Sequence, residues 1–66
     1  QAQRREAEAV IAEAVSRLPE DYQTVLILRV FEERPAEEVA ERMGRTAGAV
    51  RMLQMRALAA LREAMG

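Results

Sequence analysis

The fold of this chain is decided by one stretch, which reads Pro35-Ala-Glu-Glu-Val-Ala-Glu-Arg-Met-Gly-Arg-Thr-Ala-Gly-Ala-Val-Arg-Met-Leu-Gln-Met55. Val39, Ala40 and Met43 recur at the spacing of one helix face and form an apolar stripe. Ala40 is small, so a second helix can cross close to it. The first half of the stretch therefore predicts a short helix over residues 36–43.

A turn and a second helix follow this stripe directly. Gly44 comes after the last apolar residue, where the left-handed conformation that ends a helix costs least. Thr46 can cap the next helix with its hydroxyl, and Val50 restarts the apolar stripe. A small residue, a glycine and a branched apolar residue at these distances are the pattern of a DNA-binding helix-turn-helix, here over about residues 36–55.

The size and composition of the chain allow one small domain. A chain of 66 residues buries only about 60% of its unfolded surface, so we expect a single domain over 1–66 with modest stability. Half of the residues are apolar, but Tyr22 and Phe31 are the only aromatic ones. Such a core suits packed helices, and we predict an all-α, compact four-helix array. Because the chain begins at Gln1 and not at Met, we expect it to be a fragment of a longer protein.

Residue types that carry chemistry are scarce. The chain contains neither Cys nor His, which excludes disulfides, thiolate metal sites, Cys nucleophiles and imidazole chemistry. The neighbouring acids Glu32-Glu33 and Glu37-Glu38 would point about 100° apart on a helix, so they form no acid–base pair. We therefore expect no catalytic residues, no metal site, no cofactor and no enzyme activity. No apolar run approaches the ~20 residues of a membrane span, so we expect a cytoplasmic protein with no membrane partner.

Charge is distributed unevenly along the chain, whose formal net charge is −1. Residues 1–43 carry six arginines and ten acidic residues, whereas residues 44–66 carry four arginines and one acidic residue. The basic part coincides with the second half of the helix-turn-helix, where phosphates would lie. Clustering by chance in a short chain is the alternative explanation.

Two more helices precede the helix-turn-helix. Residues 2–17 predict an amphipathic helix, with charged residues such as Arg4 outside its apolar face. That face comprises Ala7, Val10, Ile11, Ala14 and Leu18. Pro19 ends this helix and suits the first turn of the next one, over about 19–32. The run from Val25 to Phe31 is too apolar for an exposed side, so we expect it to form the buried centre, with Arg29 reaching to the surface.

The last helix, over about 47–65, can be divided into two faces by steps of about 100° per residue. Val50, Ala57, Leu61 and Ala64 share the inward face, with Leu53 on one flank and Gln54 and Met65 on the other. Gly48, Arg51, Met52, Met55, Ala59 and Arg62 lie on the outward face. A recognition helix reads bases with the amino end of such an outward face.

The chain also resembles a known family. Residues 18–31, Leu-Pro-Glu-Asp-Tyr-Gln-Thr-Val-Leu-Ile-Leu-Arg-Val-Phe, followed by Glu37-Glu-Val-Ala40, Gly44 and Gly48-Ala-Val50, resemble region 4 of bacterial RNA polymerase sigma factors. The resemblance covers about residues 10–65 and is closest to the extracytoplasmic-function (ECF) group of the sigma-70 family.

This resemblance implies a winged-helix-like, four-helix domain that binds the promoter −35 element through its last helix during transcription initiation. It also implies docking on the RNA polymerase core, at the flap of the β subunit, and in many members sequestration by an anti-sigma factor. The chain departs from the family at Glu33, Arg34 and Pro35, which stand where Gly, Leu and a Ser or Thr cap are common. Leu53-Gln54 stands where Arg-Leu is usual, so either the last helix is slightly rotated or Gln54 is hydrogen-bonded.

The candidate DNA-binding residues lie in the turn and on the outward face of the last helix. They are Arg45, Thr46, Ala47, Gly48, Arg51, Met52, Met55 and Arg56. Arg51 is the best base-reading candidate, because Arg pairs with guanine O6 and N7, or else it is an ordinary solvated arginine. Arg45 and Arg56 can hold phosphates or stay in solvent, and Thr46 caps the helix with or without a phosphate contact. Gly48 either lets the backbone approach DNA or is merely tolerated in the helix.

Met52 and Met55 leave two functions open. An exposed Met pair suits an adaptable protein contact, although it can also touch thymine methyl groups or be scattered apolar surface. The first function is promoter binding by a sigma factor. The second is a sigma-like interaction module that an anti-sigma factor or another regulator holds through Met52 and Met55, with little DNA binding. A two-component output domain is a third possibility, which the Leu-Pro helix and the Arg-x-Phe ending disfavour.

Overall fold

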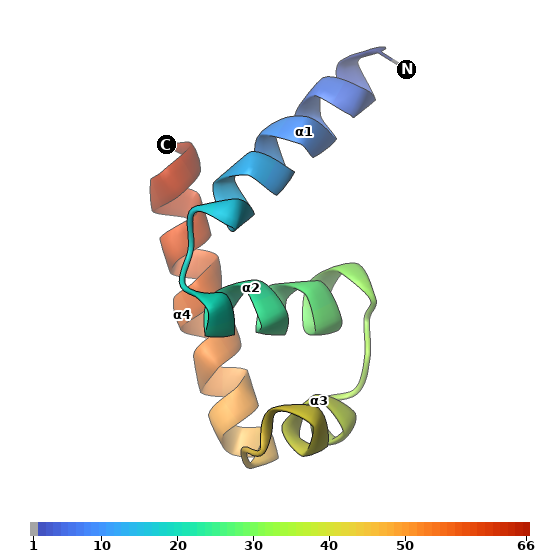
Figure 1. Ribbon diagram of the computed structural model, residues 1–66, viewed down its shortest axis with the longest axis vertical. Helices are drawn as coiled ribbons and strands as arrows, with labels where there is room; N and C mark the ends of the chain where they lie inside the picture. Colours follow the sequence, from blue (N-terminus) through green and yellow to red (C-terminus); the bar gives the residue numbers. More distant parts are fainter. Residues whose placement is uncertain (1) are drawn as a thin grey trace.

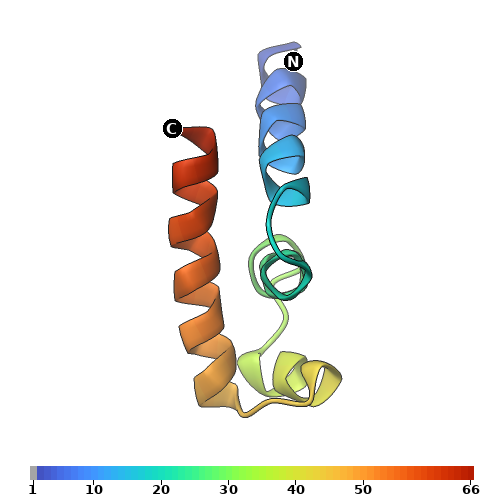
Figure 2. The same ribbon diagram turned by 60° about the vertical axis from the view of Figure 1, so that its left-hand side comes forward.

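The molecule is built around its last helix, α4 (Ala47–Met65), and the other helices are stacked along one side of it (Figures 1 and 2). The computed structural model describes the backbone of residues 2–66 and the side chains of residues 5–66. α1 (Ala2–Ser16) lies beside the carboxyl half of α4, and α2 (Glu20–Leu26) crosses its middle. α3 (Ala36–Met43) lies at its amino end, so the shape is elongated, with extents of 38 × 22 × 15 Å. The predicted all-α, four-helix array is confirmed.

Among its described side chains, those of residues 5–16, α1 packs through its carboxyl half. Ala14 and Val15 are buried, and Ile11 is partly buried against the core. The prediction that Ala7 and Val10 share the buried face is wrong, because both are exposed, Val10 by 54%. The reason is visible in Figure 1, where α1 leans away from α4 toward its amino end. Arg4, predicted on the polar face, lies outside the described side chains.

The second helix is divided into two parts. Pro19 is its N-cap and its carbonyl accepts a hydrogen bond from the Gln23 N–H at 3.0 Å. After Leu26 the chain continues as a π-helical segment, η1 (Ile27–Phe31), whose wider turn closes when the Glu32 N–H donates to the Ile27 carbonyl at 2.9 Å. No residue type marks such a turn in the sequence, which predicted one regular helix.

Only some of the apolar side chains of this helix reach the core. Leu28 is buried, as are Val25 and Leu26 in α2. Ile27, Val30 and Phe31 are exposed by 42%, 38% and 52%, so the predicted burial of the whole run is wrong for these three.

The helix-turn-helix has the predicted boundaries and the predicted stop and cap. Gly44 adopts the left-handed conformation at φ 67°, and the Arg45 N–H after it donates to the Ala40 carbonyl at 2.9 Å. Thr46 is the N-cap of α4, where its hydroxyl oxygen accepts from the Ala49 N–H at 3.0 Å. These two local devices fix where α3 ends and α4 begins.

The core is a single cluster shared by all the helices. Its largest fully buried side chains are Leu26 and Val25 from α2, Val39 from α3 and Val50 from α4. The small residues Ala40 and Ala57 are also buried, which lets the helices approach closely. Burial of Val39 and Val50 in one cluster holds α3 and α4 in the orientation of a helix-turn-helix.

Candidate nucleic-acid interface

The amino half of α4 presents a face that no other helix covers. Gly48, Arg51, Met52 and Met55 are all exposed, with Met52 at 53% and Met55 at 67%. We call these four residues the reading face. The predicted division of α4 is confirmed, since Val50 and Ala57 on the opposite side are fully buried.

The beginning of α4 is open to a ligand. Its first turn carries no acidic residue, so the partial positive charge of its backbone N–H groups is not offset there. Thr46 uses its oxygen as the cap but is exposed. A Cβ atom added at Gly48 would meet only the Thr46 hydroxyl oxygen, at 4.0 Å, so nothing in the chain occupies this space. Ala47 is half-buried and packs against the core, and it therefore offers mainly backbone.

Two of the candidate arginines are held by acids from earlier helices. Arg45 Nη2 lies 2.6 Å from Asp21 Oδ2 at the start of α2. Arg51 Nη2 lies 3.3 Å from Glu37 Oε2 in the first turn of α3. These pairs could not be predicted from the sequence, because the partners are 24 and 14 residues apart. The basic character of the amino end of α4 is thus smaller than the count of arginines implies.

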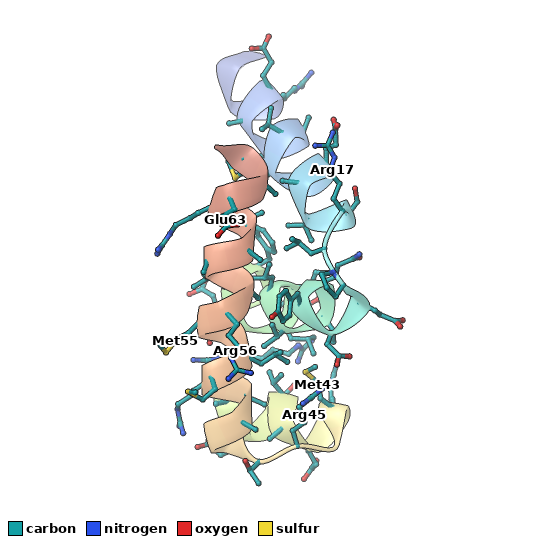
Figure 3. All side chains as sticks on the ribbon, turned by 90° about the vertical axis from the view of Figure 1, so that its left-hand side faces the viewer. Arg17, Met43, Arg45, Met55, Arg56 and Glu63 are labelled. Atoms are coloured by element: carbon teal, nitrogen blue, oxygen red, sulfur yellow. The ribbon has the colours of Figure 1, made fainter. Side chains whose placement is uncertain are left out.

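Arg56 differs from these two arginines. It is exposed, and it has no ion pair among the side chains of residues 5–66. Figure 3 shows Met55 and Arg56 pointing in different directions from α4, so Arg56 lies at the edge of the reading face.

Comparison with known proteins identifies the domain. The family model for sigma-70, region 4 matches residues 8–61. The chain belongs to this sigma factor family. The family binds promoter −35 DNA and RNA polymerase, and it is a DNA-binding regulatory family and not a family of enzymes. Searches of curated proteins and of solved structures give no significant match.

Behind the reading face, the region 4 domain has a polar brace between η1 and α4. Arg29 Nε donates to Gln54 Oε1 at 2.9 Å, and Arg29 Nη1 donates to the Arg34 carbonyl at 2.8 Å. Gln54 is therefore hydrogen-bonded, one of the two outcomes expected for its place near the apolar stripe. Arg29 as a whole is half-buried and these two hydrogen bonds hold its guanidinium, so the expectation that it reaches to the surface stays a prediction.

The connector between η1 and α3 is also held by polar contacts. Hydrogen bonds to the carboxylates of Glu32 and then Glu38 raise the pKa of Arg34 above its usual value, so Arg34 stays charged. Glu33 has a positive φ of 53°, which residues other than glycine rarely adopt. Pro35 offers no side-chain cap to α3, and its carbonyl instead accepts from the Glu38 and Val39 N–H groups, both at 3.1 Å.

A second surface feature of the domain is an apolar groove of about 610 Å³ between α1 and the α2–η1 helix. Its walls include Ile11, Val15, Ile27 and Phe31, and Glu8 and Gln23 add polar groups. Figure 1 shows the η1 end of this helix on the side of the molecule away from α4. The groove and the reading face are therefore separate surfaces.

The described residues include neither a candidate membrane-spanning helix nor a candidate metal-binding group. Within residues 2–66, no helix is both long and apolar enough to cross a membrane. Among the described side chains, no group of three or more acidic residues is placed to hold a metal ion.

Proposed function

We propose that this domain binds the −35 element of a promoter as part of an ECF-type sigma factor, acting in the cytoplasm. The observation that carries the proposal is the amino half of α4, which combines an uncovered reading face with a first turn that carries no acidic residue of its own. A helix of this kind enters the major groove with its first turns against base edges.

Each candidate residue has a distinct role in this proposal. Arg51 reads guanine by a bidentate hydrogen bond, because it lies on the reading face. Arg56 holds a phosphate without giving up an ion pair, whereas Arg45 has to leave Asp21 to hold one. The exposed Thr46 hydroxyl adds a neutral contact. Ala47 and Gly48 bring backbone close to the DNA, while Met52 and Met55 contact thymine methyl groups.

The apolar groove suits the second partner, the flap of the polymerase β subunit. Ile27 and Phe31 expose 42% and 52% of their surface there, and an amphipathic helix could cover both. Since the groove is separate from the reading face, the domain can hold polymerase and DNA together. This arrangement is what transcription initiation requires of a sigma factor.

Salt dependence of duplex binding tests the proposal. Phosphate contacts from Arg45 and Arg56 give a log–log slope near −1.8, from about −0.9 per phosphate. One small module buries only about 600–1,000 Å², so the affinity of the isolated domain should be weak. Fluorescence anisotropy with a labelled duplex measures both quantities.

Two variants make this test specific. Arg56→Ala should reduce the slope by about 0.9, whereas Arg17→Ala, in the exposed turn after α1, should leave it unchanged. A flat salt response of the unmodified chain would contradict the proposal, as would an equal loss with both variants.

A second function, protein binding with little DNA binding, is favoured by the two exposed methionines. Met52 and Met55 lie one turn apart, a spacing that helix-in-groove contacts use. An anti-sigma factor or other regulator that covered them would compete with DNA. Changing both residues to Ser should weaken binding of the regulator by more than about 1 kcal/mol, because truncation of a side chain that anchors an interface costs at least that much binding energy.

The control for this change is Met65→Ser, since Met65 is 47% exposed at the other end of α4. Competition between a labelled promoter duplex and the anti-sigma factor measures the effect. Normal binding of the regulator by the double variant would contradict this function, and so would a complex that holds regulator and DNA together.

A further inference from the structure

Glu37 and Arg51 face each other across the helix-turn-helix. Glu37 lies in the first turn of α3, and its carboxylate Oε2 is 3.3 Å from Arg51 Nη2 on the reading face. Both side chains remain exposed, by 73% for Glu37 and 57% for Arg51. Among the side chains of residues 5–66, this is the only ion pair that joins α3 to α4.

The geometry leaves most of the Arg51 guanidinium free. A guanidinium carries five N–H donors, and Glu37 accepts from only one nitrogen, Nη2. Nη2 carries two N–H groups, and Glu37 needs only one of them. The other one forms a free fork with the adjacent N–H of Nη1 or Nε, so Arg51 can donate to the two acceptors of a guanine edge while Glu37 still holds it.

A phosphate contact is different. To reach the DNA backbone, Arg51 must leave Glu37, and the carboxylate that stays behind repels the phosphate. The pair therefore favours base edges over the backbone as the target of Arg51.

We propose that Glu37 is a positioning residue that determines specificity: it aims Arg51 at base edges and penalises its use on phosphates. This inference rests on the proposed DNA-binding function and deepens it. Glu37 itself need not touch DNA, because its effect passes through Arg51.

The expected effect is a change in the ratio of two affinities. An exposed ion pair changes an equilibrium by a factor of about 1.4 to 5. Glu37→Gln should raise affinity for an unrelated duplex by about two- to fivefold and steepen its salt slope by about 0.9, since Arg51 is released to a phosphate. Affinity for the preferred duplex should change little, so the specificity ratio should fall by about two- to fivefold.

The experiment uses a duplex selected by the unmodified chain from a randomised library, and a scrambled duplex of the same composition. Anisotropy titrations of both, over a range of salt concentrations, give the ratio and the slopes. Glu41→Gln is the matched control, because Glu41 is exposed one turn further along α3 and has no ion pair within residues 5–66. It should strengthen binding to both duplexes equally. In an Arg51→Ala background, Glu37→Gln should no longer change the ratio.

Three results would overturn the inference alone: an unchanged ratio in Glu37→Gln, the same fall in Glu41→Gln, or the same fall without Arg51. If the unmodified chain bound no duplex in a salt-dependent way, the proposed function would fail and this inference with it. The two failures are therefore distinguishable.

Discussion

The brace between Arg29 and Gln54 should contribute measurably to stability, and a double-mutant cycle can measure it. Gln54→Ala removes the acceptor that lies 2.9 Å from Arg29 Nε, and Arg29→Ala removes the donor. Comparing the two single variants with the double variant isolates the pairwise energy, because the packing lost in each single variant cancels.

The magnitude follows from the charge and the exposure of the partners. A hydrogen bond to a charged group contributes about 1.5–3 kcal/mol when it is well shielded. Both side chains are half-buried, so water replaces part of the lost interaction. We therefore expect a coupling energy of about 1 kcal/mol, which corresponds to about 4–8 °C in Tm for a domain of this size.

Urea denaturation followed by circular dichroism gives the free energy of unfolding for each variant. The control cycle uses Glu13 and Arg17, which are closer, at 2.6 Å, but 67% and 65% exposed. Exposed pairs one helical turn apart contribute only about 0.3–0.5 kcal/mol, so burial should outweigh distance. A coupling energy for Arg29 and Gln54 no larger than the control value would refute this reasoning.

Two backbone positions give further predictions. Glu33→Gly should raise the free energy of unfolding by about 0.5–1 kcal/mol. Removing the strain of a positive φ of 53° stabilises the folded state by about 1–2 kcal/mol, and the greater conformational freedom of the unfolded chain subtracts about 0.4–1 kcal/mol. Glu33→Ala keeps the strain and should give no such gain in the same urea titration. Gly48→Ala should stabilise the helix by about 0.4–1 kcal/mol, since its Cβ would meet only Thr46 at 4.0 Å. The same variant should lower affinity for the selected duplex severalfold, and unchanged affinity would show that backbone does not approach DNA at Gly48.

The sequence predicted the helix-turn-helix well because its determinants are local. Gly44 ends α3 by its left-handed conformation, and Thr46 caps α4 within three residues of the N–H that it binds. The outward face of α4 also followed from periodicity alone. Such features depend on neighbours in the chain, which the sequence displays directly.

The features that the sequence missed depend on distant residues or on an irregular backbone. Ile27 and Phe31 are exposed, although their apolar character indicated burial, and the π-helical turn that contains them has no sequence signature. Gln54 accepts a hydrogen bond from Arg29, which lies 25 residues away in the sequence. The pairing of Glu37 with Arg51 needed the angle between α3 and α4, which no local pattern contains.

The central claim is that α4 reads bases through Arg51 while Arg56 only holds the backbone. Selection from a randomised duplex library with the unmodified chain, Arg51→Ala and Arg56→Ala tests it most directly. Arg51→Ala should lose about 1–3 kcal/mol on the preferred site and relax the preference at one or two adjacent base pairs. Arg56→Ala should weaken all sequences alike and leave the selected motif unchanged. An even loss of affinity across the library with Arg51→Ala would contradict the claim.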